Sequence, residues 1–171
     1  VALSLIGHSL CIIFVVLYLI HRSGETWETF GLSRPQLGDL GIAVALVMAD
    51  FALSRRFVDT MLLDDTSNGE GPFRSPGSSV EWLLMVVMCL VSGFSEELVT
   101  RAYLITRLER LLQSRFQAVL LSSLAFASYH IYYGVGPRLI YFVLFGMVFG
   151  GFYLLIRRLW PFALAHALIN M

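Results

Sequence analysis

The sequence predicts an all-α fold, a polytopic membrane helical bundle in which residues 1–171 form a single membrane domain. Composition is the first reason: 57% of the residues are hydrophobic and 14% are charged, whereas about a quarter are charged in soluble domains. Patterning is the second reason, because the apolar residues gather in about six segments, at 2–20, 37–54, 80–106, 116–130, 138–156 and 159–171. A lipid bilayer is therefore the expected environment of the chain.

Local signals support the individual segments. The first apolar run continues to Ile20 without a small-residue cleavage site, which favours a spanning helix over a signal peptide. Ser33-Arg-Pro35-Gln36 is typical of a helix start with proline in the first turn, and Ser78-Ser-Val-Glu81 is typical of a capping box. Several segments are shorter than the ~20 residues that a straight spanning helix needs, so we expect tilted, re-entrant or half-helices.

The connectors also carry information. Residues 55–79 are predicted to form the one substantial extramembrane loop. Seven arginines lie in the odd-numbered connectors and four in the even-numbered ones, which favours the odd connectors as cytoplasmic.

The net charge of zero gives no indication of a nucleic-acid partner. Gly146-Met-Val-Phe-Gly150 is a small-residue pattern that favours close helix packing.

Ionisable residues interrupt three of the apolar segments. Glu96 and Glu97 lie in the third, His130 ends the fourth, and His166 lies in the sixth, four residues before Asn170. A charge at the centre of a bilayer costs roughly 2.5–3.5 kcal/mol, so paired carboxylates there need a functional or structural reason.

These residues fall at similar depths. If residues 80–113 form one helix and the chain turns near Ser114, Glu96 and His130 are each 17 residues from residue 113. With a rise of about 1.5 Å per residue, Glu96 lies roughly 16 Å below Arg107, and His166 roughly 12 Å below Arg158. Three segments therefore bring polar side chains to one level, which indicates hydrolytic chemistry inside the membrane.

Each residue also has a simpler explanation when it is taken alone. Glu97 and Arg101 are i and i+4 on one helix face, so an ion pair is expected between them. Glu96 has no basic residue at i+3 or i+4, and its burial stays unexplained. His130 could belong to an aromatic belt, and His166 with Asn170 could be a hydrogen-bonding pair between helices.

Three motifs together resemble one family. They are E-E-x-x-x-R at 96–101, F-x-x-x-H from Phe126 to His130, and H-x-x-x-N from His166 to Asn170. In this order they are similar to the signatures of the CAAX prenyl-protease and bacteriocin-processing (CPBP, or ABI) family of intramembrane glutamic endopeptidases. The resemblance covers about residues 80–171, which it implies are a four-segment catalytic core.

The resemblance implies a mechanism and a location. Glu96 and His130 would activate a water, His166 and Asn170 would donate to the developing oxyanion, and Glu97, Arg101 and Phe126 would support them. The implied reaction needs no cofactor and cleaves a peptide bond of a membrane-anchored protein or peptide. A prokaryotic cytoplasmic membrane is the expected location, and a cavity open toward the Arg-rich connectors, with a lateral route for the substrate, is the expected access.

Other functions compete with this one. Glu96, His130 and His166 could instead ligate zinc with a water in the open position, although no H-E-x-x-H motif is present. A non-proteolytic membrane scaffold or immunity factor of the same fold is a second alternative. A proton or ion pathway is a third, and it would need polar residues leading to both faces.

Overall fold

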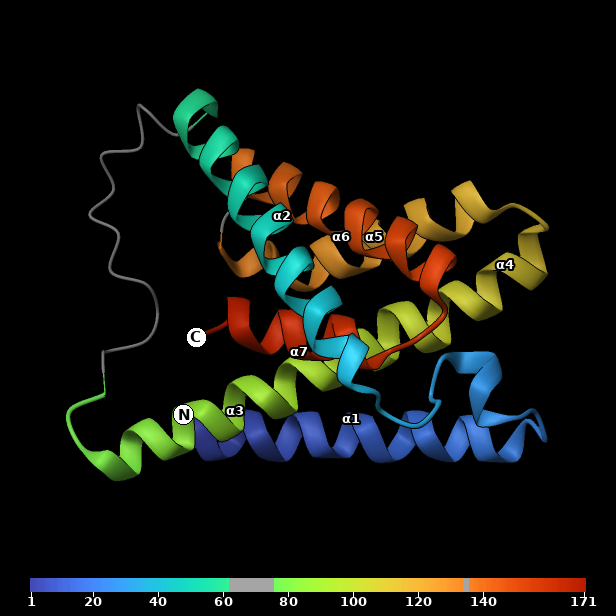
Figure 1. Cartoon of the computed structure of the whole chain (residues 1–171), viewed down its shortest axis with the longest axis horizontal. Helices are drawn as coiled ribbons and strands as arrows, with labels where there is room; N and C mark the ends of the chain where they lie inside the picture. The colour runs from blue at the N-terminus through green and yellow to red at the C-terminus, as the bar shows by residue number, and fades with distance from the viewer. Residues whose placement is uncertain (62–75, 134–135) are drawn as a thin grey trace.

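The computed structural model describes residues 1–61, 76–133 and 136–171, and every regular element within these ranges is helical (Figure 1). The all-α class is thereby confirmed. The elements are α1 (Ala2–Arg22), a short 3-10 turn (Trp27–Phe30), α2 (Leu37–Met61), α3 (Ser79–Glu97), a π-helical segment (Leu98–Ile105), α4 (Thr106–Leu112), α5 (Arg115–Tyr129), a second 3-10 turn (Ile131–Tyr133), α6 (Pro137–Ile156) and α7 (Trp160–Ile169).

Within the described ranges, four helices are long and apolar enough to cross a membrane: Ala2–Arg22, Leu37–Arg56, Ser79–Leu112 and Pro137–Ile156. The helix α5 has 15 residues and α7 has 10, so neither reaches across a bilayer as a straight helix. The six apolar segments all fall on helices, but a count of six spanning segments is not confirmed. The protein is membrane-embedded, with two short helices packed among four long ones.

The third apolar segment forms one continuous helix of 34 residues, as the expected turn near Ser114 requires. Gln113 ends it in the left-handed conformation (φ 53°), and the Ser114 hydroxyl then caps α5 by accepting from the Gln117 amide. The π-helical segment interrupts this long helix directly after Glu97, and such segments often mark functional sites. The helix is therefore irregular where its charged residues lie.

Two expectations need correction. The helix α2 begins at Leu37, so Pro35 lies before its first turn; there the Gln36 amide donates to Asp39 Oδ2. The same helix continues to Met61, so residues 55–61 are helical rather than part of the predicted loop. Residues 62–75 of that loop lie outside the described residues.

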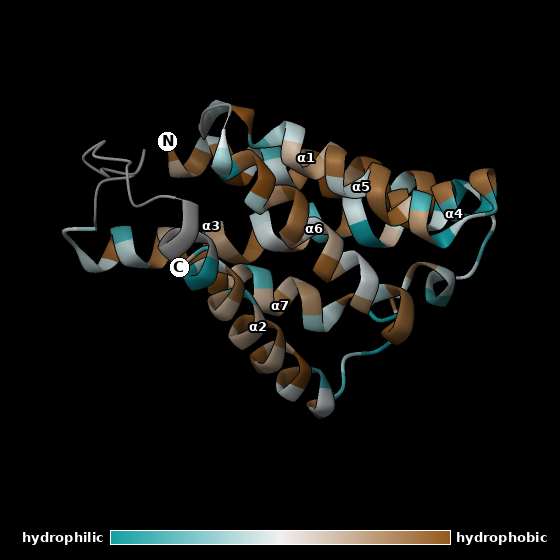
Figure 2. Cartoon of the chain, turned by 90° about the horizontal axis from the view of Figure 1, so that it is seen from above, coloured by the Kyte–Doolittle hydropathy of each residue, from teal (hydrophilic) through white to brown (hydrophobic). Residues whose placement is uncertain are grey.

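Ion pairs join the connectors at the end of the bundle where α4 lies. Asp39 receives two hydrogen bonds of 2.7 Å from Arg158, which links α2 to the turn before α7. Glu25 pairs with Arg107 and Arg110, and Glu109 pairs with Arg115 and Arg157. Figure 2 shows hydrophilic residues near α4, whereas hydrophobic residues predominate along α1 and α2. We call this part of the bundle, with Arg107, Arg110, Arg115, Arg157 and Arg158, the Arg-rich end. Its ion pairs connect the ends of neighbouring helices.

Glycines allow the helices around the polar residues to approach closely. A Cβ on Gly93 of α3 would lie 2.8 Å from the backbone nitrogen of Ala167 on α7. On Gly146 of α6 it would lie 2.8 Å from the Ser123 Cβ of α5, which confirms the packing motif. The helix α7 therefore lies against α3 at a separation that only glycine permits.

We predict that Gly93→Ala destabilises the protein, because the added methyl meets backbone atoms that cannot rotate away. The expected loss is about 1–3 kcal/mol, measured as a lower thermal midpoint in detergent. Gly151→Ala is the matched control, since a Cβ there has nothing within 4 Å. Equal midpoints for the two variants would show that α3 and α7 can separate without cost.

Candidate active site

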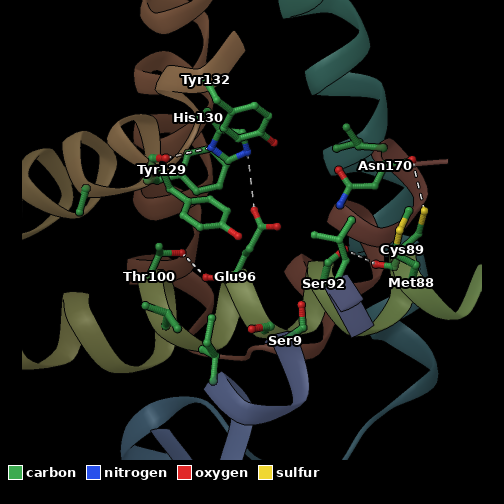
Figure 3. Close-up of a pocket in the computed structure, with 17 residues that line it drawn as sticks. Ser9, Met88, Cys89, Ser92, Glu96, Thr100, Tyr129, His130, Tyr132 and Asn170 are labelled. Carbon is green, nitrogen blue, oxygen red and sulfur yellow. Dashed lines mark hydrogen bonds and ion pairs between the residues drawn. The ribbon is translucent and has the colours of Figure 1, made fainter. Parts of the chain in front are cut away.

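The polar residues of three helices meet around Glu96, as the expected matched depths require, and Figure 3 shows Glu96 facing His130. Glu96 and Glu97 are on the last turn of α3, His130 follows the last residue of α5, and His166 lies on α7. Glu96 Oε2 is 3.8 Å from His130 Nε2 and 3.6 Å from His166 Nε2. Both distances exceed a direct hydrogen bond, so the carboxylate faces two imidazoles without bonding to either.

His166 is held by the carboxylate of Glu97, which the sequence predicted to pair with Arg101. Its Nδ1 lies 2.6 Å from Glu97 Oε1, and the same oxygen is 3.0 Å from Arg101 Nη1. The expected Glu97–Arg101 ion pair is present, but the contact with His166 was not foreseen. Because a carboxylate only accepts, Nδ1 carries the proton in this hydrogen bond, and the ring turns Nε2 toward Glu96.

His130 is oriented in the same way by a different acceptor. Its Nδ1 lies 2.9 Å from the Phe126 carbonyl oxygen one turn earlier on α5, so Nδ1 donates and Nε2 faces Glu96. The Phe126 ring packs on the imidazole at 4.5 Å between centroids, and the Phe142 ring stacks on it at 4.2 Å. Phe126 therefore supports His130 with both its carbonyl and its ring.

Arg101 is almost completely buried, and aromatic rings surround it. Its guanidinium carbon lies 4.9 Å from the Phe126 ring centroid, 5.6 Å from that of Phe145 and 5.5 Å from that of Phe149. At these distances the guanidinium makes cation–π interactions with the rings, and these interactions offset part of the hydration that Arg101 loses on burial. The guanidinium also donates to Thr100 Oγ1 at 2.6 Å, and that hydroxyl donates to the Glu96 carbonyl oxygen at 2.6 Å.

Asn170 is a predicted site residue whose side chain does not bond to Glu96, His130 or His166 in the described part of the chain. It caps α7 and lines the cavity with an exposed side chain, and its carbonyl oxygen accepts from the Cys89 thiol at 3.3 Å. Within the described part of the chain, no hydrogen bond joins its amide to Glu96 or to either histidine. Figure 3 shows it across the cavity from His130.

The site opens into a cavity of about 520 Å³. Its wall includes a stripe of α1 that sequence reasoning missed, formed by Leu5, Ser9 and Ile12. Their i, i+4, i+7 spacing places them on one face of α1. The sequence alone does not indicate which part of the protein packs against that face. The remaining lining residues are Met88, Cys89, Ser92, Ser95, Glu96, Val99, Thr100, Ala125, Phe126, Tyr129, His130, Tyr132, Ile169 and Asn170.

The cavity lies elsewhere in the bundle than an opening toward the Arg-rich connectors would place it, and the lateral route for the substrate stays a prediction. Its lining residues come from the first half of α1, the middle of the long helix and the final residues of α5 and α7. All of these lie away from the Arg-rich end, where α5 and α7 begin. The two short helices stop beside the cavity, so it occupies the half of the bundle remote from the Arg-rich connectors.

The metal alternative has no preformed site among the described residues. No group of three or more His, Cys, Asp or Glu side chains there is arranged to hold a metal ion. The donor set around Glu96 consists of its carboxylate and two Nε2 atoms at 3.6 and 3.8 Å from it. In a tetrahedral zinc site with bonds of about 2.0–2.2 Å the donor atoms lie about 3.3–3.6 Å apart, so these separations are close to those of zinc ligands and leave the alternative to a chelator test.

Comparison with known proteins adds the family. No curated protein and no solved structure matches the chain. The model of the family described as type II CAAX prenyl endopeptidase Rce1-like matches residues 78–171, more than half of the chain, and this range contains all three motifs. The chain therefore belongs to the Rce1-like family of CAAX proteases, as the resemblance of its motifs to CPBP proteins indicated.

Proposed function

We propose that the protein is an intramembrane endopeptidase in which Glu96 and His130 activate water to hydrolyse a peptide bond. The observation that carries this proposal is the Glu96 carboxylate. Its Oε2 is buried, faces two imidazole nitrogens and has no hydrogen-bond donor among the described residues. A buried carboxylate oxygen of this kind is ready to accept a hydrogen bond from water or substrate.

The two carboxylates have different roles in this mechanism. Glu97 is fully buried and bonds to Arg101 and His166, so both partners already engage its carboxylate. Glu96 has no such cation bonded to it and can accept a proton from water, as a general base requires. His130 Nε2, on the other side of the same space, accepts the second hydrogen bond of that water and orients it.

The reaction then proceeds by addition and elimination. The activated water adds through its oxygen to the scissile carbonyl carbon, while its proton passes to Glu96. The negative charge on the carbonyl oxygen is stabilised by hydrogen bonds from His166 and Asn170, and one such donor contributes roughly 3–4 kcal/mol. For His166 this role requires the imidazolium form, which the carboxylate of Glu97 stabilises. Glu96 returns its proton to the leaving nitrogen as the carbon–nitrogen bond breaks.

The cavity supports a membrane-anchored substrate. Leu5, Ile12, Met88 and Ile169 give it an apolar wall, whereas Ser9, Ser92 and Ser95 add hydroxyl groups. The description of the family names prenyl endopeptidases, so a peptide with a prenylated C-terminal tail is the first substrate that we propose. The same peptide without the prenyl group tests whether the lipid is recognised.

The Glu96→Gln variant is predicted to fold normally and to lose cleavage. Glutamine has the same shape but cannot take up the proton of water, so turnover should fall by about 10²–10⁴-fold. The measurement is cleavage of a fluorogenic prenylated peptide by purified protein in detergent, with thermal midpoints recorded in parallel.

Glu28→Gln is the control for Glu96→Gln, because Glu28 is exposed in the α1–α2 connector. Full activity of Glu96→Gln would overturn the proposed mechanism. Inhibition by a chelator, with recovery on adding zinc, would favour a zinc-dependent protease instead.

The Arg101→Met variant is predicted to lose stability rather than chemistry. It leaves the Glu97 carboxylate buried without its cation, which costs about 3–5 kcal/mol. We expect a low yield of folded protein, measured by size-exclusion profile and thermal midpoint.

A second substitution tests the reason for that loss. Adding Glu97→Gln to Arg101→Met removes the stranded charge and should recover part of the stability. A double variant no more stable than Arg101→Met would refute the charge-pairing explanation.

A further inference from the structure

The helix α2 carries a buried carboxylate to which the proposed reaction gives no role. Asp39, Ala43, Leu46 and Asp50 are buried and follow one another at helical spacing, so they form one face of α2. Asp39, at one end of this face, is paired with Arg158 in the Arg-rich end. Asp50 lies within the membrane-spanning part of α2. An ionisable residue at such a position is a candidate functional residue, and its partner must be identified.

The partner of Asp50 is a tyrosine on α6. The Tyr141 hydroxyl donates to Asp50 Oδ1 at 2.6 Å, a short O–H···O hydrogen bond. Asp50 is 7% exposed, so water competes little for this bond. It joins α2, which lies outside the residues that the family model matches, to the first turns of α6.

The same turns of α6 contact both histidines of the site. Phe142 follows Tyr141 directly, and its ring stacks on His130 with centroids 4.2 Å apart and planes at 24°. Phe145, one turn further along, meets His166 at 5.3 Å and 65°. The position of α6 at Tyr141 therefore sets where Phe142 contacts His130 and where Phe145 contacts His166.

His130 is the imidazole that depends most on this contact. It lies beyond the last residue of α5, where the helix no longer constrains it from both sides. Its ring contacts the rings of Phe142 and Phe126 at 4.2 and 4.5 Å, and more distantly those of Tyr129 and Tyr132 at 5.5 and 6.3 Å. If Phe142 moved, the imidazole would lose its nearest ring contact, and the direction in which Nε2 points would rest mainly on the Nδ1 bond to Phe126.

We propose that Asp50 and Tyr141 form a positioning pair, which holds the start of α6 so that Phe142 keeps His130 facing Glu96. This proposal rests on the proposed function, in which His130 orients the attacking water. A simpler role, a hydrogen bond that only joins two helices, would affect stability but not the orientation of His130. The two roles can be separated by experiment.

The first test compares two tyrosines of the same helix. In Tyr141→Phe the bond to Asp50 is lost, and kcat should fall about tenfold with KM unchanged, as expected when a hydrogen bond to a charged group no longer positions a catalytic side chain. The control is Tyr153→Phe, which removes a buried hydroxyl near the other end of α6 and should leave kcat unchanged. Equal kcat values for the two variants would overturn the proposal.

A second set of variants tests the route through Phe142. Phe142→Leu should lower kcat about as much as Tyr141→Phe, and the double variant should show no further loss, because both changes release the same ring. Fully additive losses would overturn this route. If Tyr141→Phe fails to fold because the Asp50 carboxyl group is left unpaired, the double variant Asp50→Asn with Tyr141→Phe removes that carboxyl group as well and replaces Tyr141→Phe in every comparison.

The last measurement does not depend on activity. The chain contains four histidines, so ¹⁵N-histidine labelling gives few ring signals, each assigned by a His→Gln variant. Tyr141→Phe should shift the His130 signals and leave those of His8 and His21 unchanged, whereas Tyr153→Phe should shift none of the three. Unchanged His130 signals would overturn the positioning pair even if the enzyme cleaves peptide. Shifted signals in a protein whose Glu96→Gln variant is fully active would retain the pair and refute the proposed function.

Discussion

The Glu97 carboxylate, with none of its surface exposed, is the centre on which the rest of the site depends. A charge in such a place is tolerated only if it is paired and hydrogen-bonded, and the pairing recruits Arg101 from its own helix and His166 from α7. Arg101 in turn needs the faces of three phenylalanines from α5 and α6. One buried charge thus explains why four helices pack around this point and why Gly93 is needed where α7 approaches α3.

From this centre the geometry of the two histidines follows. Glu97 accepts a hydrogen bond from Nδ1–H of His166, and the Phe126 carbonyl accepts one from Nδ1–H of His130, so both imidazoles turn Nε2 toward Glu96. Each ring has a hydrogen bond at Nδ1 that sets its orientation and aromatic packing that sets its plane. The two short helices α5 and α7 place these rings beside the cavity that Glu96 lines.

The family match covers residues 78–171, but the first two helices also contribute to the site. The helix α1 supplies part of the cavity wall, and α2 joins the Arg-rich end through Asp39 and the start of α6 through Asp50. Because α1 and α2 lie outside the residues that the family model matches, the match by itself does not describe all the surroundings of the site.

The sequence by itself determined the helical class, the hairpin at Gln113–Ser114, the Glu97–Arg101 pair and the level at which Glu96, His130 and His166 meet, because periodicity and a fixed rise per residue are local properties. Only the tertiary structure decided that Glu97 also binds His166, that α1 lines the cavity, that Asp50 bonds to Tyr141, and that the cavity lies away from the Arg-rich end. Those outcomes depend on how helices rotate about their axes and which of them become neighbours. Side-chain packing over the whole bundle sets the rotation of each helix and the choice of its neighbours. The spacing of residues within one segment does not contain this information.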